Sequence, residues 1–393
     1  MVEHAGGRRR RRQRADPSPL PLLSDDLLAE IFLRLPPEPI YLFRASFVSK
    51  HWRGLVHDAR FLRRFREFHG GTPPVLGFFN NQLGSPFFVP TTGDFALSTA
   101  ARMSTGDWYA LDCRHGRALL IDSHRPETLL VWDLVTGDKR GLAFPPAYSV
   151  GRHWSYNGVV LSAAGHGDCH SSPFMVAFMF TDHHNFTTSV CVYTSDTGVW
   201  GKITSIAVPG ASVLSVPTPL VGNTLYRMLD NNTIFDADPE NKKWVIEFDL
   251  DTHSLDLTGE IPHNMIDRYG RCIIIMPADD GRLGFAGVDG FSLHLWSSVA
   301  SVDGRATWAH CRVIDLESLL PPEAVVACMH PLSFMRPPPE AVGYIEDANV
   351  IFVFVYPSIY MINLNSMKIE EVSDKGNNWF VLFFLTQVST VQE

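Results

Sequence analysis

The sequence predicts a small all-α unit at the N-terminus followed by a large all-β domain. Between residues 22 and 65, apolar residues recur at the three- and four-residue spacing of helices. After residue 75, short runs rich in Val, Ile, Phe, Tyr and Trp alternate with clusters of Gly, Asp, Asn and Pro. The change of pattern falls at the Gly and Pro pairs of residues 70–74, which interrupt helical spacing. These observations predict two domains.

The bulk composition favours a folded protein in a reducing compartment. Of the 393 residues, 45% are hydrophobic and 11% aromatic, too many for a disordered chain. The six cysteines show no C-x-x-C spacing, which is typical of free thiols. No apolar run approaches the about 20 residues that cross a bilayer, and no signal peptide follows the N-terminal arginines. We therefore expect no membrane contact and a cytoplasmic or nuclear location.

Residues 1–20 are predicted to be a disordered basic tail. Arg8 to Arg12 and Arg14 form a run that is either a nuclear import signal or a solvated tail. With Glu3 and Asp16 the first 21 residues carry +4, so the net charge of −9 leaves about −13 on the remainder. An acidic body argues against nucleic acid as a partner, because phosphate binding needs a basic face.

The first predicted helix begins after Ser24, a good N-cap, and Asp25 and Asp26 favour its positive end. It ends at Pro36 and Pro37, which cannot continue a helix. Its apolar residues share one face, with Leu33 outside it. The residues on this face are Leu27, Leu28, Ile31, Phe32 and Leu35.

Three further helical pieces are predicted. The second helix starts near Pro39 and is apolar almost all round, so it is buried on several sides. A third, short helix carries Trp52, and a fourth piece carries Phe61 and Phe65. A unit this small rarely buries so much apolar surface alone, and it contains no Cys for a staple. The surplus predicts a docking face for another protein; the alternative is a bundle that packs only against its own chain.

Three short patterns lie in this stretch. They are Leu-Leu-x-Glu-Ile at 27–31, Leu-Pro-Pro at 35–37 and Val-Ser-Lys-x-Trp-Arg at 48–53, followed by Phe-Leu at 61–62. In order, spacing and composition they resemble an F-box, which we place at residues 21–68, with a linker at 69–74. Two positions depart from the usual pattern. The opening Leu-Pro reads Leu22-Leu23-Ser24, and the Cys often found before Lys50 is Ser49.

The F-box resemblance implies a three-helix motif that binds the Skp-type adaptor of cullin–RING ubiquitin ligases. It predicts that ten residues form the adaptor-binding face, with Lys50 at its rim. These residues are Leu27, Leu28, Ile31, Leu35, Pro36, Pro37, Leu42, Val48, Lys50 and Trp52.

A loose repeat runs through residues 75–393. Each phrase is an apolar strand, then Asp, Asn or Ser, then a turn, and the phrases start at residues 129, 189, 244, 291 and 359. These starts lie 47 to 68 residues apart, close to the about 50 of a kelch-type blade. The domain is therefore predicted to be a β-propeller of about six blades, and it resembles the propeller-like domains that follow the F-box in many plant proteins. The alternative is a pair of irregular β-sandwiches.

No motif in the β domain predicts catalysis. His166, Cys169 and His170, followed by Asp182-His183-His184, form the one metal-like cluster, but the surrounding glycines favour a loop. We find no P-loop, G-x-S-x-G or H-E-x-x-H pattern, and Gly287–Gly290 lacks the context of a phosphate cradle. We therefore expect no metal, no cofactor and no enzymatic activity. Trp154 is the one candidate for a substrate contact.

These predictions combine into one hypothesis with two alternatives. The chain is predicted to be a non-catalytic substrate receptor of an SCF-type ubiquitin ligase, in which the β domain binds a target protein. One alternative is a sugar- or small-molecule-binding or enzymatic propeller with a vestigial F-box. The other is a non-degradative scaffold.

Overall fold

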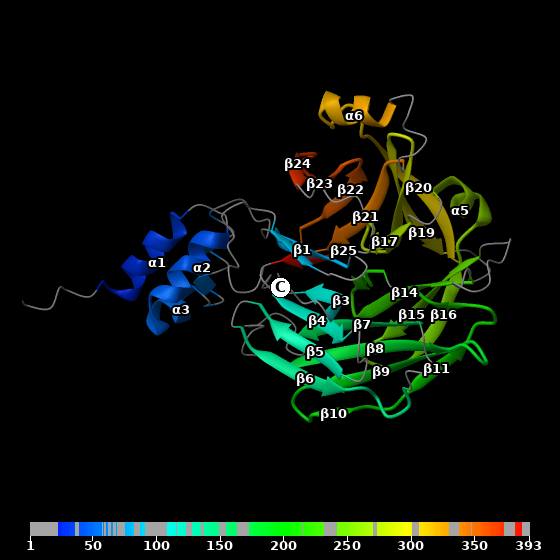
Figure 1. The fold of residues 1–393 in the computed structure, drawn as a ribbon, viewed down its shortest axis with the longest axis horizontal. Coiled ribbons are helices and arrows are strands. Elements are labelled where there is room, and N and C mark those ends of the chain that lie inside the picture. Colours follow the sequence, from blue (N-terminus) through cyan, green and yellow to red (C-terminus); the bar gives the residue numbers. More distant parts are fainter. Residues whose placement is uncertain are drawn as a thin grey trace, which may run out of the picture.

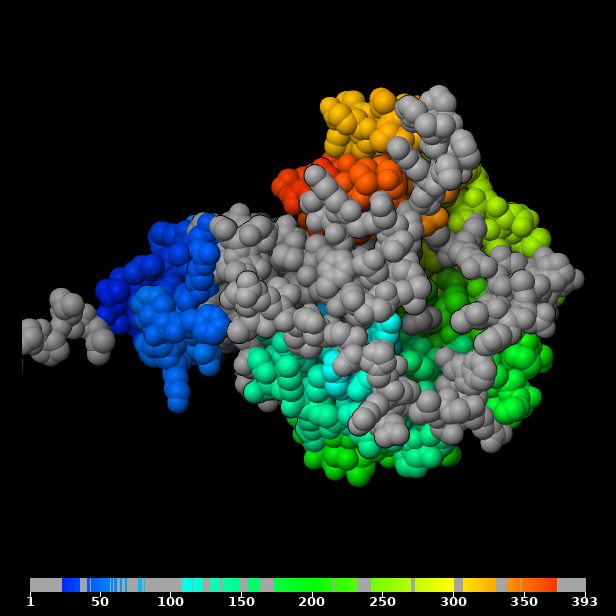
Figure 2. All heavy atoms as spheres, in the orientation of Figure 1, coloured from blue at the N-terminus to red at the C-terminus, as the bar shows by residue number. Residues whose placement is uncertain are grey.

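The protein folds into a helical unit and a β domain, which lie side by side along the long axis of the computed structural model (Figures 1 and 2). The structure describes residues 23–35, 39–56, 58, 60–61, 64–65, 68, 75–81, 87–90, 108–114, 116–122, 128–134, 137–148, 155–162, 173–214, 216–231, 242–269, 273–300, 306–329, 338–346, 348–372 and 382–386. The predicted tail (1–20) and linker (69–74) lie outside these residues, so both stay predictions.

The helical unit contains the first three of the four predicted helical pieces as α1 (Asp25–Leu33), α2 (Pro39–Val48) and α3 (Lys50–Val56). In the fourth predicted piece, the described residues 60, 61, 64 and 65 are helical as well. Ser24 caps α1, because its hydroxyl oxygen accepts a hydrogen bond from the backbone N–H of Leu27 at 3.4 Å. Ser49 caps α3 in the same way, accepting from the N–H of Trp52 at 3.1 Å. The Ser in place of the usual Cys therefore has a structural role here.

The core of the helical unit corrects one prediction about α1. Leu33, expected outside the apolar face, is buried, whereas Leu27 and Ile31 are exposed. The buried face of α1 is rotated because α3 and the buried side chains of Phe61 and Phe65 share the core that receives α1. The helix thus packs on residues 28, 29, 32 and 33 and leaves the row 27 and 31 uncovered.

The β domain contains five blades made from consecutive antiparallel strands (Figure 1). The first blade has β3 (Trp108–Arg114), β4 (Arg117–Asp122), β5 (Thr128–Asp133) and β6 (Lys139–Ala143). The second has β7 (Ser155–Ser162), β8 (Phe174–Asp182), β9 (Thr187–Thr194), β10 (Val199–Trp200) and β11 (Thr204–Ala207). The third has β12 (Ser212–Val213), β13 (Leu220–Val221), β14 (Thr224–Asp230), β15 (Lys243–Asp249) and β16 (Leu255–Glu260).

The fourth blade has β17 (Ile274–Pro277), β18 (Leu283–Asp289), β19 (Ser292–Ala300) and β20 (Ala306–Asp315). The fifth has β21 (Glu340–Ile345), β22 (Val350–Val355), β23 (Ser358–Asn363) and β24 (Ile369–Val372). Two short helices lie in the connections between blades: α5 (His263–Tyr269) before β17 and α6 (Pro322–Met329) before β21. The fold is thus the predicted propeller, and its hydrophobic cores lie between neighbouring blades.

A three-stranded sheet, which we call the closing sheet, joins the two ends of the domain. It contains β1 (Val75–Asn80), β2 (Phe87–Pro90) and β25 (Leu382–Thr386), with β1 between the other two. β25 contacts β21 on one side and β3 on the other, which places the closing sheet between the fifth and first blades. The described residues therefore form five blades of consecutive strands, against about six predicted. The closing sheet lies in the ring between the fifth blade and the first.

The repeat found in the sequence marks one structural position. The phrases that start at residues 129, 189, 244, 291 and 359 correspond to β5, β9, β15, β19 and β23, and each of these strands is third in the four-strand order of its blade. The closing sheet has no such phrase, because its strands come from distant parts of the chain. The number of repeated phrases in the sequence equals the five blades. The prediction of about six came from dividing the length of the domain by the length of a typical blade.

The turn after this strand is built alike in four blades. A residue with positive φ lies four positions beyond the strand's last residue, which is Asp, Thr or Asn: Gly137 (82°), Gly198 (71°), His253 (56°) and Met367 (58°). In the first blade the N–H of Gly137 donates to the carbonyl oxygen of Asp133 at 2.8 Å. In the third, one carboxylate oxygen of Asp249 accepts from the N–H groups of residues 251 and 252. In the fifth blade the side chain of Asn363 likewise accepts from the N–H groups of residues 365 and 366, and these side-chain contacts explain the Asp and the Asn of the third and fifth phrases.

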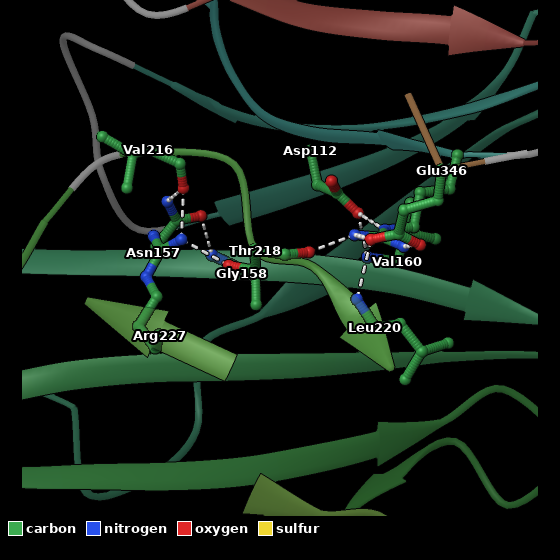
Figure 3. A network of polar contacts seen from close by, with 10 residues as sticks. Asp112, Asn157, Gly158, Val160, Val216, Thr218, Leu220, Arg227 and Glu346 are labelled. Atoms are coloured by element: carbon green, nitrogen blue, oxygen red, sulfur yellow. Dashed lines mark hydrogen bonds and ion pairs between the residues drawn. The ribbon is translucent and has the colours of Figure 1, made fainter. Parts of the chain in front are cut away.

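A buried polar network fixes the connection between β12 and β13 inside the ring (Figure 3). Arg227 on β14 is 1% exposed and donates to the carbonyl oxygens of Leu214, at 2.6 Å, and Val216. Its guanidinium also donates to the hydroxyl of Thr218. Burial lowers the pKa of Arg227 to about 9, an effect that the charge of Asp112 opposes. One arginine thus satisfies three groups of the same connection.

The network continues into the first, second and fifth blades (Figure 3). Arg114 on β3 donates to the carbonyl oxygen of Thr218 and forms ion pairs with Asp112, at 3.2 Å, and Glu346, at 2.9 Å. Glu346, directly after β21, also accepts from the N–H of Leu220 at 2.7 Å. The N–H of Val160 on β7 donates to Asp112 at 2.9 Å. Four blades therefore contact one connected set of polar groups.

We predict that Arg227→Met lowers the free energy of unfolding by about 3–5 kcal/mol, because it leaves several buried oxygen acceptors without their donor. The measurement is urea unfolding followed by tryptophan fluorescence. Arg282→Met is the matched control, because its side chain is 58% exposed and it should unfold like the parent chain. Equal losses in the two variants would contradict this role of Arg227.

We predict that Gly137→Ala costs about 1 kcal/mol. This is the strain of positive φ in a residue with a Cβ, partly offset because alanine lowers the conformational entropy of the unfolded chain. A Cβ at Gly137 would meet no atom within 4 Å, so the penalty comes from the backbone. Gly141→Ala on β6 is the control, because Gly141 has no positive φ and its Cβ would make an ordinary contact with Thr128 at 3.7 Å. Thermal unfolding of both variants distinguishes them; a stable Gly137→Ala would refute the argument.

Candidate functional site

The helical unit presents exposed apolar side chains along α1 and at the end of α2, and also at Phe68, which is 59% exposed. Leu27 and Ile31 lie four residues apart on α1 and are 54% and 48% exposed, and Leu23, just before the N-cap Ser24, is 49% exposed. Phe47 and Val48, at the end of α2, are each 62% exposed. We call Leu23, Leu27, Ile31, Phe47 and Val48 the exposed apolar set. They lie outside the core of the unit, which eight other residues fill.

The structure divides the ten residues predicted to bind the adaptor. Leu27, Ile31, Val48 and Lys50 are exposed and available to a partner. Leu28 and Leu42 are buried in the unit's own core, so they support the helices from behind. Pro36 and Pro37 lie outside the described residues.

The two remaining predicted residues, Leu35 and Trp52, are half-buried against the core. The ring of Trp52 packs edge-on against Phe32, with centroids 4.9 Å apart. Sequence reasoning missed Leu23 and Phe47 as exposed residues. The usable signal for Leu23 was its place just before the N-cap Ser24, outside the helix, whereas nothing in the sequence distinguishes Phe47 from its buried neighbours on an all-apolar helix.

Charged side chains connect the helices of the unit. Glu30 on α1 forms ion pairs with Arg34 at 2.9 Å and with Arg64 at 2.5 Å. Hydrogen bonds from Arg34 and then Arg64 lower the pKa of Glu30. His51 on α3 lies 3.0 Å from Asp25 on α1. These groups are exposed, so they contribute little to stability and mainly orient α1 against its neighbours.

In the β domain, the candidate substrate contact Trp154 lies outside the described residues, and so do His166, Cys169 and His170 of the metal-like cluster. Asp182 uses one carboxylate oxygen to accept from the N–H of His184 at 2.9 Å, which is a turn contact. Within the described residues, no group of three or more His, Cys, Asp or Glu is placed to hold a metal ion. No described helix has the length and apolar character needed to cross a membrane.

A histidine pair lies in the fourth blade. Nδ1 of the buried His294 on β19 is 3.0 Å from Nε2 of His310 on β20. Nη2 of Arg268, on α5, is 3.5 Å from the other nitrogen of His294, and Arg268 also pairs with Asp289 at 2.8 Å. Burial, followed by the charges of Arg268 and His310, lowers the pKa of His294. The arrangement therefore requires a neutral His294 to link α5 to the blade.

Two family models match the chain. One, described as F-box domain, covers residues 20–64, and the other, described as F-box protein AT5G49610-like, beta-propeller, covers residues 109–382. The second match spans well over half of the sequence. The chain belongs to this family of F-box proteins. F-box domains in general bind Skp-type adaptors of cullin–RING ligases, and an F-box joined to a propeller supports a substrate-receptor role in general terms.

Solved structures with a similar outline share little sequence with this F-box protein. Oligogalacturonate lyase in complex with manganese is 9% identical with a TM-score of 0.37, and the match covers 76% of this chain and 73% of that one. The WD40 domain of SCAP from fission yeast is 10% identical with a TM-score of 0.37, covering 67% and 52%. A puromycin hydrolase variant is 11% identical with a TM-score of 0.35, and the match covers 67% of this chain but only 39% of the hydrolase.

Likenesses this weak carry no argument about function. A search of curated proteins returned no match. The family assignment of the F-box protein therefore rests on the two family models together with the helical unit and propeller seen in the structure.

We predict that the F-box protein loses stability as the pH falls below about 6.5. The native pKa of His294 is lower than its ordinary value of 6.5, so the unfolded chain binds more protons in this range. The stabilising contribution is complete above pH 6.5 and is lost as the pH falls through the native pKa. The measurement is the unfolding midpoint in urea as a function of pH.

His294→Gln should flatten this pH dependence, because the titrating group is removed. The control is His263→Gln, whose histidine side chain is 60% exposed at the start of α5. If the parent and His294→Gln curves were parallel between pH 7 and pH 5, titration of His294 would not be the cause.

Proposed function

We propose that this F-box protein is the substrate receptor of an SCF-type ubiquitin ligase. Its F-box docks on a Skp-type adaptor, and its propeller holds a target protein. The observation that supports this most strongly is the exposed apolar set on a unit whose own core is already filled. Large apolar side chains that remain 48–62% exposed on so small a unit favour a protein partner.

The size of the exposed apolar set fits a stable interface. Fully burying a large apolar side chain contributes about 1.5–3 kcal/mol, and half of that surface is still available on each of these residues. Five such residues offset a substantial part of the cost of association, which consumes about 4–15 kcal/mol. Lys50, exposed at the first position of α3, supplies a polar contact at the rim. The buried Leu28 and Leu42 act indirectly, because they fix the positions of the helices.

In this proposal the propeller does no chemistry. It brings a target protein close to the ubiquitin-loaded enzyme, and the tether raises the effective concentration of the target's lysines. The blades provide a rigid frame, and the loops at their ends provide the contact surface. The acidic body of the chain favours protein over nucleic acid as the partner. A cytoplasmic or nuclear location is part of the same proposal.

The test replaces two exposed residues that the core does not need. Leu27→Glu with Ile31→Glu places charges in the middle of the proposed interface while keeping residues that favour a helix. We predict that this double variant loses at least about 100-fold in affinity for the adaptor, because it removes two apolar contacts and buries charge. The measurement is co-purification with a Skp-type adaptor, followed by titration.

Leu257→Glu is the matched control, because this leucine is also exposed, at 46%, but lies on β16 of the propeller. It should bind the adaptor as the parent chain does. Unchanged adaptor binding by the double variant, with helical content preserved, would refute the proposed docking face. Ubiquitin transfer to a captured partner in a reconstituted ligase then separates a degradative receptor from a scaffold.

A further inference from the structure

A cleft of about 320 Å³ lies between the first and second blades. One wall comes from β4, β5 and β6 of the first blade, and the other from the start of β8 and the turn after β9 in the second. Hydrogen bonds fix the second wall: Ser195 donates its N–H to the carbonyl oxygen of Phe174 at 2.9 Å, and its hydroxyl accepts from the N–H of Phe174 at 2.8 Å. The volume is sufficient for two side chains of a bound peptide.

Arg140 on β6 reaches across this cleft in a fixed orientation. Its guanidinium carbon lies 5.5 Å from the ring centre of Phe174 and 5.8 Å from that of Tyr193, both of which are buried. Its Nη2 donates to the carbonyl oxygen of Ser195 at 3.1 Å. An arginine held by two rings and one hydrogen bond loses little side-chain entropy when it binds an anion. Its guanidinium still has N–H groups to offer.

The two walls carry opposite charges that do not pair with each other. Arg140 lies on the first blade and Asp196 on the turn of the second, and both line the cleft and are exposed. Among the described residues, neither has an opposite charge within ion-pair distance. The deeper Arg117 is already paired with Asp133 at 3.5 Å. Asp138 and Lys139 line the cleft as well, so Arg117, Lys139 and Arg140 are balanced by Asp133, Asp138 and Asp196. Arg140 and Asp196 are the opposite charges that lie on different walls without pairing, and they suit a ligand that carries both charges.

We propose that this cleft binds a peptide segment of the captured protein in which an acidic residue lies next to a basic one. This inference rests on the proposed function, because it names the class of substrate that the receptor recognises. The carboxylate of the peptide pairs with Arg140, in the two-pronged geometry that arginine offers, and its cation pairs with Asp196. A dianionic phosphate is disfavoured, because the three carboxylates of the lining balance its three cations and leave no excess positive charge.

The experiment uses the full chain and four synthetic peptides that differ only in a central pair: Glu-Lys, Gln-Lys, Glu-Gln and phosphoserine-Lys. Fluorescence anisotropy of labelled peptides gives the affinities. Labelling of arginines with phenylglyoxal, read by mass spectrometry, gives the location. We expect the Glu-Lys peptide to bind best and to protect Arg140, but not the exposed Arg282, from labelling. Replacing either charged residue of the peptide should weaken binding about tenfold, as expected for loss of a charge-assisted hydrogen bond.

Two variants test which charged residue of the cleft binds which charged residue of the peptide. Arg140→Met keeps an unbranched side chain over the rings and should abolish the advantage of Glu over Gln. Asp196→Asn should abolish the advantage of Lys over Gln and leave the Glu preference intact. Arg282→Met is the control and should bind all four peptides like the parent chain. Overturning results are an unchanged affinity for Glu-Lys in Arg140→Met, tighter binding of the phosphoserine peptide, or no protection of Arg140 by any peptide.

The outcome is separable from that of the proposed function. Arg140→Met should still co-purify with the Skp-type adaptor, and the Leu27→Glu with Ile31→Glu variant should still bind the Glu-Lys peptide. If the cleft fails its test while adaptor binding persists, the receptor recognises its target elsewhere. If adaptor binding fails while the cleft binds peptide, the propeller is a peptide-binding module outside a ligase.

Discussion

The buried polar network around the β12–β13 connection is the contact on which the centre of the propeller depends. Within each blade, backbone hydrogen bonds pair the strands, but separate blades are separate sheets. The network supplies polar contacts between them: Arg114, Asp112 and Glu346 join the first and fifth blades, and Arg227 and Asn157 attach the third and second. Buried charges are costly unless they are paired and hydrogen-bonded. Here Arg114 pairs with Asp112 and Glu346, and the guanidinium of Arg227 donates to three oxygens, while its Nε has no hydrogen-bond partner among the described residues.

The closing sheet solves the other problem of a ring, which is how its ends meet. β25 pairs with β1, so strands from the two ends of the β domain share backbone hydrogen bonds. A loosely closed ring would let neighbouring blades slide past one another. In this domain Trp200 of the second blade also donates its ring N–H to the carbonyl oxygen of Ala143 in the first, at 2.9 Å. A fixed junction between these blades is what gives the cleft beside it a definite shape.

The helical unit and the propeller use apolar residues differently. In the propeller, the large apolar side chains of neighbouring blades fill the space between sheets. In the helical unit, a compact core leaves a row of leucine and isoleucine on α1 exposed. The apolar contacts between blades stabilise the propeller without a partner. The exposed row on α1 contributes hydrophobic stabilisation only when a partner buries it. This difference supports a division into an adaptor-binding part and a target-binding part.

The sequence alone determined the local features of this protein. Ser24 and the proline pair predicted the limits of α1, because capping and chain termination depend on neighbouring residues. The repeated strand phrase located the strand that is third in the sheet order of each of the five blades, because alternation and turn residues are local signals as well. The fold class, a helical unit followed by a β-propeller, followed from these patterns and was then confirmed by the fold and the family models.

Which residues face each other depends on the tertiary structure. Helical periodicity placed Leu33 outside the apolar face of α1, yet Leu33 is buried, because the partners of α1 determine how far its buried face extends. The sequence gives no sign that β25 returns to β1, or that Arg140 and Asp196 line one cleft, since these residues are far apart along the chain or on separate blades. Such contacts depend on how complete blades pack, and that packing is set by the whole ring.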